Sequence, residues 1–535
     1  MVDKSLLRRG DGGRYELHEL IRQYATERLQ VQSSEALSTQ ERHCAYYTGL
    51  LQSQASRMHG EREAQQRIRE ELDNVRDAYA WAANTANVAR LQQATEGLFE
   101  FYYLVGFYRE AIAVAEQTMA RLQPLSIDPA QPGQRLLGIL HIYHAYGCTR
   151  LARLEQAAAS TQAALAVGEA LADPELQARG HLNRWDVAYM RGDAETSREA
   201  AETALLLARL HGLPKYQCMS LFALAECLCN SGELAASLAY LHEALGIAQM
   251  IGERTWESEV LKDLGNTYTQ LDELSQALHY YQQALHISRP FNNQRLTVVA
   301  LYNQAVILVR VGQFVLAQHN AEEALAIVRQ LGLRNREANL LALLGSLACQ
   351  QDDAATARRY CEQALAIAQD DEIYLLESTL ITLGNALIEL GSHEKADQLF
   401  QQALTAFQAK GDQLGVMQAR AGLAHALSAQ NQPTAAKAQA EEILCLLQIN
   451  TGYRHGDCAH LYLTCHHLLS ADRCCKELLE QGYQWLQEQA AKLGSEDLRH
   501  SFLENVPANR ALIALAETME NGIRDTGNGN NGERP

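Results

Sequence analysis

The sequence predicts an all-α protein whose helices form a right-handed superhelical solenoid, and a repeated spacing is the main reason. A turn residue recurs about 40 residues apart at seven places, namely Gly192, Gly232, Asp272, Gly312, Asp352, Gly391 and Asn431. About twelve residues after each of the first six turns stands an alanine–leucine pair, beginning with Ala204 and Leu205. The chain has only nine prolines and no long alternating runs of β-branched residues, which disfavours β-sheet. A fixed period is typical of solenoids, in which each unit buries its apolar face only against its neighbours.

The repeat at residues 259–290 illustrates why two helices are expected in each unit. A first stripe at helical spacing consists of Leu261, Leu264, Gly265, Tyr268 and Leu271. Within it, Gly265 has no side chain and so lets the next helix approach closely. After Asp272 breaks the pattern, a second stripe consists of Leu274, Ala277, Leu278, Tyr281, Ala284 and Leu285. We expect Pro290 to close this unit, and Pro174 and Pro214 to close two earlier ones, because proline cannot continue a helix interior.

This unit resembles the tetratricopeptide repeat. That family's core pattern is Leu-Gly-x-x-Tyr, a turn, and then Ala-x-x-x-Tyr/Phe-x-x-Ala, and here it is matched by Leu264, Gly265, Tyr268, Ala277, Tyr281 and Ala284. Other copies differ, since Trp185 and Ala305 replace the glycine that Gly345 and Gly384 keep. The period exceeds the family's usual ~34 residues, so the helices should be longer by about a turn and a half in total. Armadillo or HEAT repeats are the structural alternative.

The first 31 residues carry a second resemblance. The run V-D-K-S-L-L from Val2, a glycine-rich turn at Gly10–Gly13 and the run Y-E-L-H-E-L-I-R-Q-Y-A from Tyr15 resemble the end of the winged-helix module in STAND-class (NB-ARC-like) signalling ATPases. This class includes bacterial transcriptional regulators. We expect a short strand, a hairpin turn and a helix over Tyr15–Leu29. Two further runs, Glu71–Arg76 and Leu498–Pro507, resemble the sensors of the same family.

The ATPase domain of that family is missing from this sequence. Its phosphate loop requires a Gly-x-x-x-x-Gly-Lys-Ser/Thr motif, yet the chain has no Gly-Lys pair, and no DNA-binding helix-turn-helix domain can be placed. We therefore expect either a fragment of a longer protein or a split gene product that kept the sensor arm. We expect no cofactor and no nucleotide binding by this chain alone, since helix N-termini by themselves hold phosphate weakly.

Five regions are expected along the chain. They are a winged-helix remnant at 1–31, N-terminal helical pairs at 32–134, tetratricopeptide-like repeats at 135–449, C-terminal capping helices at 450–521 and a disordered tail at 522–535. The capping helices are expected because the last unit of a solenoid needs a polar outer face. The tail ends in the polar run DTGNGNNGERP, which has too few apolar residues to fold.

Composition limits the partners and the compartment. A net charge of −18 argues against a nucleic-acid-binding surface, because phosphate contacts need clustered lysine and arginine. No apolar run approaches the about 20 residues that span a membrane, and no leader opens the chain. Twelve cysteines are scattered along predicted helices, which favours buried thiols in a reducing, cytoplasmic compartment.

Neither a metal site nor catalysis is expected. Histidines and cysteines are dense between His455 and Cys475, but their spacings match no recognised zinc motif. Cys458 and Cys465 fall on one helical stripe, which indicates buried thiols. No serine stands on a strand-to-helix elbow and no cysteine at a marked helix N-terminus, so we expect no enzyme activity.

The candidate binding residues lie on the first helices, which line the concave groove of a tetratricopeptide array. They are Arg179, Asp186, Glu226, Glu259, Lys262, Asn266, Asn303, Arg310, Asn339 and Asn385. Simple solvent exposure is the alternative reading of these polar positions. Lys262, Asn266 and Asn303 also resemble three of the five residues of the carboxylate clamp in co-chaperone repeats. Asn339 and Leu343 stand where that clamp has two basic residues.

These patterns favour a sensor or scaffold. The groove is expected to bind a protein or peptide segment, or a small effector, and to act as the sensor arm of a signalling or transcriptional regulator. The alternative is a fragment of a regulatory STAND ATPase whose nucleotide-binding domain lies outside this chain. Neither nucleic acid nor membrane is expected as a partner. The sequence does not identify the ligand, the oligomeric state or the controlled output.

Overall fold

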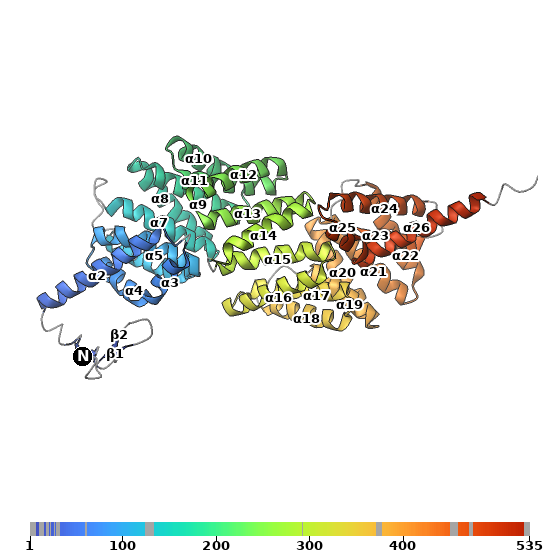
Figure 1. Cartoon of the computed structure of the whole chain (residues 1–535), viewed down its shortest axis with the longest axis horizontal. Coiled ribbons are helices and arrows are strands. Elements are labelled where there is room, and N and C mark those ends of the chain that lie inside the picture. The colour runs from blue at the N-terminus through green and yellow to red at the C-terminus, as the bar shows by residue number, and fades with distance from the viewer. Residues whose placement is uncertain are drawn as a thin grey trace, which may run out of the picture. The chain divides into compact units, whose positions relative to one another are not determined.

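The computed structural model describes most of the chain, which is built of helices and short turns apart from one small hairpin (Figure 1). The described residues are 7–9, 15–17, 21, 23–25, 27, 33–58, 61–122, 133–290, 293–370, 377–449, 458–469 and 474–528. The Gly10–Gly13 turn, His455 and residues 529–535, to which some expectations refer, lie outside this set.

Within each unit, most helices pack on the helix that follows them in the chain. The N-terminal elements are β1 (Leu7–Arg9), β2 (Tyr15–Leu17), α2 (Ser33–Ala55), α3 (Arg62–Glu70), α4 (Leu72–Asn84), α5 (Val88–Val105) and α6 (Tyr108–Leu122). The repeats comprise α7 (Gly133–Arg150), α8 (Leu154–Ala170), α9 (Pro174–Arg191), α10 (Ala194–Leu210), α11 (Pro214–Asn230), α12 (Leu234–Ile251), α13 (Arg254–Gln270), α14 (Leu274–Ser288), α15 (Gln294–Arg310), α16 (Phe314–Leu331), α17 (Arg334–Gln350), α18 (Ala354–Asp370), α19 (Glu377–Glu389), α20 (His393–Lys410), α21 (Gln413–Ala429) and α22 (Pro433–Ile449). The C-terminal helices are α23 (Ala459–Leu469), α24 (Cys474–Lys492), α25 (Glu496–Glu504) and α26 (Pro507–Asn528).

The predicted turns are confirmed. All seven turn residues lie between the two helices of a pair and have positive φ, from 59° at Asn431 to 82° at Gly232. This left-handed conformation suits glycine and is tolerated by aspartate and asparagine. Ala152, at φ 56°, holds the same position one period before Gly192. Consecutive helix pairs pack on their neighbours, so the all-α solenoid expected from the period is confirmed.

A second series of left-handed turns separates one pair from the next, and it corrects the expected role of proline. Its members include Ala172, Gly212, Gly252, Gly332 and Gly411. Pro174 and Pro214 do not end units but begin α9 and α11. The first residue of a helix suits proline because its backbone N–H would have no partner within the helix.

Glycine on a first helix allows close packing, as expected for Gly265. A Cβ atom at that position would lie 2.5 Å from Cε1 of Tyr281 on α14. At the equivalent Gly384, a Cβ atom would lie 2.6 Å from Cζ of Phe400 on α20. Tetratricopeptide-like pairing of α13 with α14 therefore depends on an absent side chain.

The N-terminal hairpin is antiparallel and corrects one expected boundary. Leu7 pairs with Leu17, Arg8 with Glu16 and Arg9 with Tyr15. Tyr15–Leu17 was expected to begin a helix, but its backbone groups find partners in β1 instead. The assignment of this segment to a winged-helix remnant stays a prediction.

Contacts divide the chain into two units, which the period in the sequence does not mark. Unit 1 comprises Met1–Ser231 and Glu243–Trp256, and unit 2 comprises Gly232–His242 and Glu257–Pro535. Unit 1 has an aromatic core in which the rings of Phe99 and Tyr143 stack at 5.0 Å. In unit 2 one core joins the repeats to the C-terminal helices; it includes Leu274, Val311, Met417, Ile443, Leu461, Trp485 and Phe502. Helix α26 continues to Asn528, past the expected end of the capping helices at 521.

One described helix, α12, is long and apolar enough to cross a membrane by length and composition alone. The expectation that no stretch approaches this limit is therefore too strict. Leu241, Ala244 and Ala248 of α12 are buried at helical spacing, which is the pattern of a second helix in a repeat.

Candidate binding face on the first helices

The first helices of successive pairs carry two groups of polar side chains, one in each unit. We call the polar side of α7, α9 and α11 the unit 1 face, and the polar side of α13, α15 and α17 the unit 2 face. The predicted groove residues up to Glu226 belong to the first face or its neighbours, and those from Glu259 to Asn339 belong to the second.

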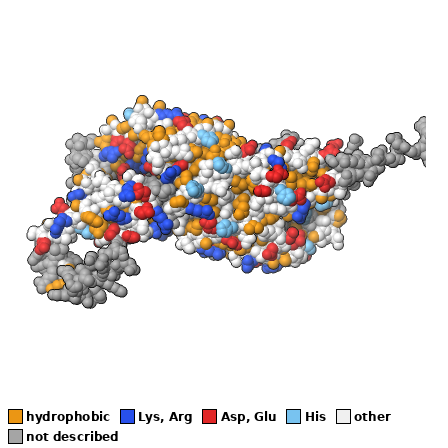
Figure 2. All heavy atoms as spheres, viewed as in Figure 1, with side chains coloured by type: hydrophobic (Ala, Val, Ile, Leu, Met, Phe, Trp, Pro, Cys, Tyr) orange, Lys and Arg blue, Asp and Glu red, His pale blue; other side chains and the backbone are white. Residues whose placement is uncertain are grey.

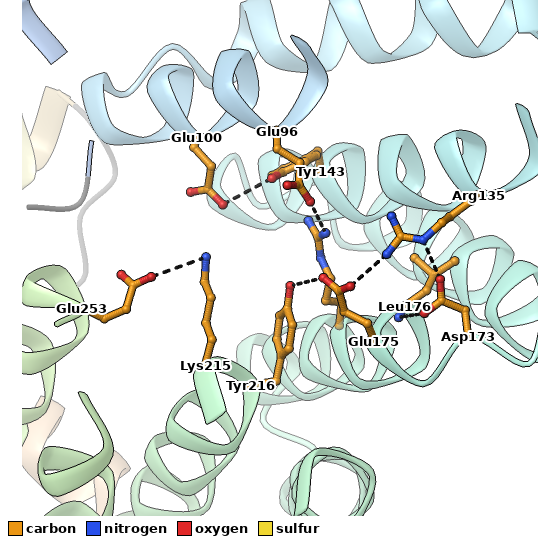
Figure 3. A network of polar contacts seen from close by, with 11 residues as sticks. Glu96, Glu100, Arg135, Tyr143, Asp173, Glu175, Leu176, Lys215, Tyr216 and Glu253 are labelled. Carbon is orange, nitrogen blue, oxygen red and sulfur yellow. Dashed lines mark hydrogen bonds and ion pairs between the residues drawn. The ribbon is translucent and has the colours of Figure 1, made fainter. Parts of the chain in front are cut away.

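An ion-pair network ties the N-terminal ends of α7, α9 and α11 together on the unit 1 face (Figure 3). Arg135 Nε donates to Asp173 Oδ2 at 2.7 Å, and its Nη2 donates to Glu175 Oε2 at 2.9 Å. Tyr216 donates its hydroxyl proton to the other oxygen of Glu175, also at 2.9 Å. At the edge of this network, Lys215 Nζ lies 4.0 Å from Glu253 Oε1.

Arg179 lies at the centre of the unit 1 face with its side chain only 9% exposed. Its Nη1 donates to Glu96 Oε1 at 3.1 Å, and its guanidinium lies over the Tyr143 ring at 5.1 Å from the centroid. Tyr143 in turn donates to Glu100 at 3.2 Å. Burial acts to lower the pKa of Arg179, but the surrounding phenols and carboxylates hold it well above its usual value.

The other predicted residues of unit 1 are also engaged. Asp186 of α9 is buried and pairs with Arg150 of α7, whose guanidinium lies 4.9 Å from the centre of the Tyr146 ring. Glu226 is half-buried on α11 and has a polar partner of its own. The cations of this face therefore have carboxylate partners before any ligand arrives.

An aromatic row on α9, α11 and α13 was not anticipated from the sequence. Trp185 contacts Phe222 edge-on at 6.4 Å between ring centroids, and Phe222 contacts Trp256 edge-on at 5.4 Å. In the sequence, Trp185 stands where other repeats have glycine, but this position does not show that the three rings meet. The three rings stand at different heights on their helices, so the 40-residue period does not align them.

On the unit 2 face, Lys262 is held by carboxylates of its own helix. Its ammonium nitrogen lies 3.2 Å from Glu259 Oε2 and 3.1 Å from Asp263 Oδ1. Burial raises the pKa of Asp263, although the Lys262 ammonium opposes this effect. Lys262 and Glu259, both predicted groove residues, are thus partners of each other.

Asn266 and Asn303 meet across α13 and α15, as the clamp hypothesis requires. The Asn303 amide donates to Asn266 Oδ1 at 2.8 Å, and the Tyr281 hydroxyl donates to the same oxygen at 2.7 Å. The Asn266 amide donates to Asp263 Oδ1 at 2.6 Å. A ligand carboxylate would have to displace these internal partners, and the clamp stays a prediction.

The remaining three predicted residues lie apart from that cluster. Arg310, at the end of α15, donates to Asp272 Oδ1 at 2.6 Å. Asn339 is half-buried on α17, and Asn385 is exposed on α19.

Arg336 is the cation that the sequence reasoning missed. It lies half-buried on α17, and within the described part of the chain it makes neither an ion pair nor a hydrogen bond. Burial and then the charge of Arg295 on α15 lower its pKa, against the weaker opposing effect of Glu259. A signal existed, because one basic residue stands near the start of four successive first helices, at Lys215, Arg254, Arg295 and Arg336.

The family of the repeats follows from a match to known patterns. Residues 216–289 and 296–370 match a family model described as tetratricopeptide repeat, and residues 378–409 match a second model with that description. These segments are tetratricopeptide repeats. The armadillo and HEAT alternatives are thereby set aside.

Part of the chain also resembles whole curated proteins. Proteins of Mycobacterium tuberculosis and Mycobacterium bovis that carry the provisional name of HTH-type transcriptional regulator are 26% identical over 320 residues. The match covers 58% of this chain and 36% of those relatives, so the chain spans about a third of their length.

Two solved structures are similar in fold. The quorum sensor NprR from B. thuringiensis has 17% identity and a TM-score of 0.48, covering 66% of this chain and 98% of its own. A STAND protein with a tetratricopeptide repeat sensor from Pyrococcus horikoshii has 15% identity and a TM-score of 0.47, covering 72% of this chain and 57% of its own.

Two cysteines of the cysteine-rich C-terminal region lie in a hydrophobic core. Cys458 and Cys465 are buried in the unit 2 core, which confirms their interpretation as buried thiols. Among the described residues, no group of three or more histidine, cysteine or acidic side chains is arranged to hold a metal ion. On the face that Figure 2 shows, acidic and basic side chains are interspersed.

Proposed function

We propose that this chain is a sensor arm that binds an acidic peptide or protein segment along the unit 2 face. The observation that carries the proposal is Arg336, a half-buried guanidinium that makes no ion pair or hydrogen bond among the described residues, on tetratricopeptide repeats. Leaving a charge partly out of water without a partner costs free energy, so an arriving carboxylate would both bind and relieve that cost.

Carboxylate is the chemistry that suits this face. Arginine presents a planar fork that binds a carboxylate through two parallel hydrogen bonds. Arg295 supplies a second positive charge, and Asn339 of the same α17 helix offers an amide donor. Repulsion between the two guanidinium groups would fall when an anion binds between them. The predicted groove residues of unit 2, from Glu259 to Asn385, are then the wider surface over which the segment lies.

The experiment is a selection of peptides by the full chain. Immobilised protein is offered a random short-peptide library with free C-terminal carboxylates, and in parallel the same library with C-terminal amides. Acidic or free-carboxylate peptides should be enriched. For an enriched peptide, Arg336→Gln should weaken binding by about ten- to a hundredfold, the size expected for lost hydrogen bonds to a charged group.

Arg358→Gln is the matched control. Arg358 lies on the second helix α18, exposed and paired with Glu362 at 2.7 Å, so its loss removes the same charge away from the face. Equal weakening by the two substitutions, or enrichment that Arg336→Gln leaves unchanged, would place binding elsewhere.

A second candidate, a longer regulator of which this chain is the sensor part, is favoured by the match to transcriptional regulators about three times the matched length. The output would then be a nucleotide- or DNA-binding domain outside these 535 residues, as in STAND ATPases. Sequencing the DNA upstream of Met1 tests this. An in-frame Gly-x-x-x-x-Gly-Lys-Ser/Thr motif supports it, and a promoter with a ribosome site there favours a free-standing scaffold.

Under either candidate the chain itself is proposed to bind rather than to catalyse. We place it in the cytoplasm, where its free cysteines would remain reduced. A small effector in the same groove is the other ligand class, and the peptide selection separates it from an acidic segment.

A further inference from the structure

Two of the seven repeat turns are covered, and this sets unit 2 apart. Asp272 is 4% exposed and Gly312 is buried, whereas the turn residues at 192, 232, 352, 391 and 431 are exposed. A Cβ atom built on Gly312 would collide with the carbonyl oxygen of Ser501 and lie 3.0 Å from Asn505 Cβ. Built on Gly192, Gly232 or Gly391, it would meet nothing within 4 Å.

The C-terminal helices cover these two turns. The residues in contact are about 190 to 220 positions apart in the chain. Gln313 donates its amide to Ser501 Oγ at 2.5 Å, and Asn505 donates to the Gly312 carbonyl at 3.1 Å. The Gly494 backbone N–H donates to Ser275 Oγ at 2.8 Å. These contacts join α25 and the residues after α24 to the start of α14 and to the turn after α15, and Figure 1 shows α25 beside the ends of α13 and α15.

Helix α23, which precedes α24 in the chain, packs on a different part of unit 2. This helix packs on α21 and α22 within the unit 2 core, and its Cys465 thiol donates to the Ala440 carbonyl oxygen at 3.6 Å. The same core continues to the covered turns through Leu274, Trp485 and Phe502. A cavity of about 20 Å³ nevertheless remains there, lined by Asp272, Leu274, Arg310, Trp485, Gln489, Leu493, Phe502 and Asn509. The Oδ1 atom of Asn509 is buried there without a hydrogen-bond partner. A hole and an unsatisfied acceptor mark a less complete fit than in a packed core.

We infer that α24–α26 form a strap, anchored through α23 on α21–α22 and latched onto the turns at Asp272 and Gly312, that opens as a unit while the repeats stay folded. When closed, the strap fixes the spacing of the α13–α14 and α15–α16 pairs, because both turns must fit it together. The helices α13 and α15 carry Lys262, Asn303 and Arg295. The strap therefore holds the unit 2 face at one curvature, and this inference does not depend on which ligand that face binds.

A reversible cross-link tests the latch directly. The Cβ atom of a residue at 494 would lie 3.6 Å from Ser275 Cβ, within the range of disulfide bonds. The Ser275→Cys/Gly494→Cys pair, in a Cys445→Ser background that removes an exposed thiol, is compared oxidised and reduced by amide hydrogen exchange. Oxidation should slow exchange in α25 by about tenfold or more, since release of the strap is the opening event.

A glycine substitution at 312, with a matched control at 391, tests whether the latch opens selectively. Asparagine and aspartate occupy this turn position at φ near 60° in three repeats, so Gly312→Asn and Gly391→Asn impose similar backbone demands at φ 73° and 74°. Only the side chain at 312 meets the strap. Gly312→Asn should speed exchange in α24–α26 by roughly ten- to a hundredfold, as expected for overpacking of a fitted site, and leave α17–α20 unchanged.

The opposite results are equally definite. Failure of the 275–494 disulfide to form would show that the latch is not closed in solution. Faster exchange across all of unit 2 in Gly312→Asn would show that the C-terminal helices are an integral cap rather than a strap. Equal behaviour of the 312 and 391 variants would show that the covered turn holds nothing in place.

Discussion

The two first-helix faces use their charges in opposite ways. In unit 1 the arginines bridge different helices: Arg135 reaches from α7 to α9, Arg150 from α7 to α9 and Arg179 from α9 to α5. In unit 2 Arg310 of α15 bridges to Asp272 in the same way, but Lys262 pairs within its own helix, and Arg336 has no described partner. Bridging pairs fix the spacing of helices, whereas locally satisfied or unpaired charges leave that spacing to packing and to ligands.

This difference teaches that groove position alone does not mark a binding residue. Arg179 and Arg336 both stand on the polar side of a first helix. The structure uses the first to hold helices together, while the second keeps its charge available. The following predictions are ordered from the largest expected effect to the smallest.

Asp186→Asn should destabilise unit 1 by about 3 kcal/mol, because it leaves the Arg150 guanidinium largely buried without an anion. Urea unfolding followed by tryptophan emission in a Trp485→Phe background measures this, since the other three of the four tryptophans lie in unit 1. Glu199→Gln, at an exposed site on α10, should change stability by less than about 0.5 kcal/mol. If both variants unfold alike, the bridging pairs do not stabilise unit 1.

Gly265→Ala should destabilise unit 2 by about 1–3 kcal/mol, because the new methyl group overlaps the Tyr281 ring. Gly246→Ala on α12 has open space around it and should stabilise the chain by up to about 1 kcal/mol through better helix propensity. Thermal melting of the two variants should shift in opposite directions. A shift in the same direction would contradict the close approach of α13 and α14.

Lowering the pH should decrease the stability of unit 1 and increase the stability of unit 2. Burial works against ionisation of Asp173, but the Leu176 N–H and the Arg135 guanidinium outweigh it and lower its pKa. Its stabilising effect on unit 1 is therefore present above the unfolded pKa, about 3.9, and is lost as pH falls through the lower folded value. The pKa of Asp263 is raised by burial, so unit 2 gains stability as pH falls through that raised value.

Substitution separates these two contributions. With Asp173→Asn, the stability of unit 1 should fall less as the pH is lowered. With Asp263→Asn, the stability of unit 2 should no longer rise as the pH is lowered. Denaturant midpoints measured between neutral pH and pH 3 provide the comparison. A gain in acid that persists in Asp263→Asn would assign it to another group.

Arg336→Gln should have the smallest effect on stability, within about 0.5 kcal/mol of the parent protein, because no described partner is lost. Relief of repulsion from Arg295 should make any change stabilising. Urea unfolding followed by the emission of Trp485, with the three tryptophans of unit 1 replaced by phenylalanine, measures this. A loss above about 1 kcal/mol would mean that Arg336 holds unit 2 together as Arg179 holds unit 1.

The repeats could be predicted because their signals are local. A turn residue that tolerates left-handed backbone, followed by apolar residues at helical spacing, fixes each pair without knowledge of the rest. The polar partnerships could not be predicted in the same way. Arg179 pairs with Glu96, 83 residues away, and Lys262 pairs with a neighbour on its own helix, yet both occupy similar sequence contexts.

The division into units and the covered turns could not be predicted either, because they depend on contacts between residues far apart in the sequence. Whether Ser501 reaches Gly312 is decided by small rotations that add up over several helix pairs. No single repeat contains that information. The glycine at 312 looks like those at 192, 232 and 391 until the chain is folded.

The left-handed turns should also influence which unit unfolds first on heating. Among the described residues, Ala86, Ala152 and Ala172 hold positive φ in unit 1, whereas the residues other than glycine that do so in unit 2 are Asp272, Asp352 and Asn431. Alanine in this conformation costs about 1–2 kcal/mol, and aspartate and asparagine offset part of that cost with local hydrogen bonds. Strain is thus concentrated in the front half of the array. Glycine at these three positions should raise the melting temperature of unit 1 without altering either polar face, which offers a route to a more stable version of the same protein.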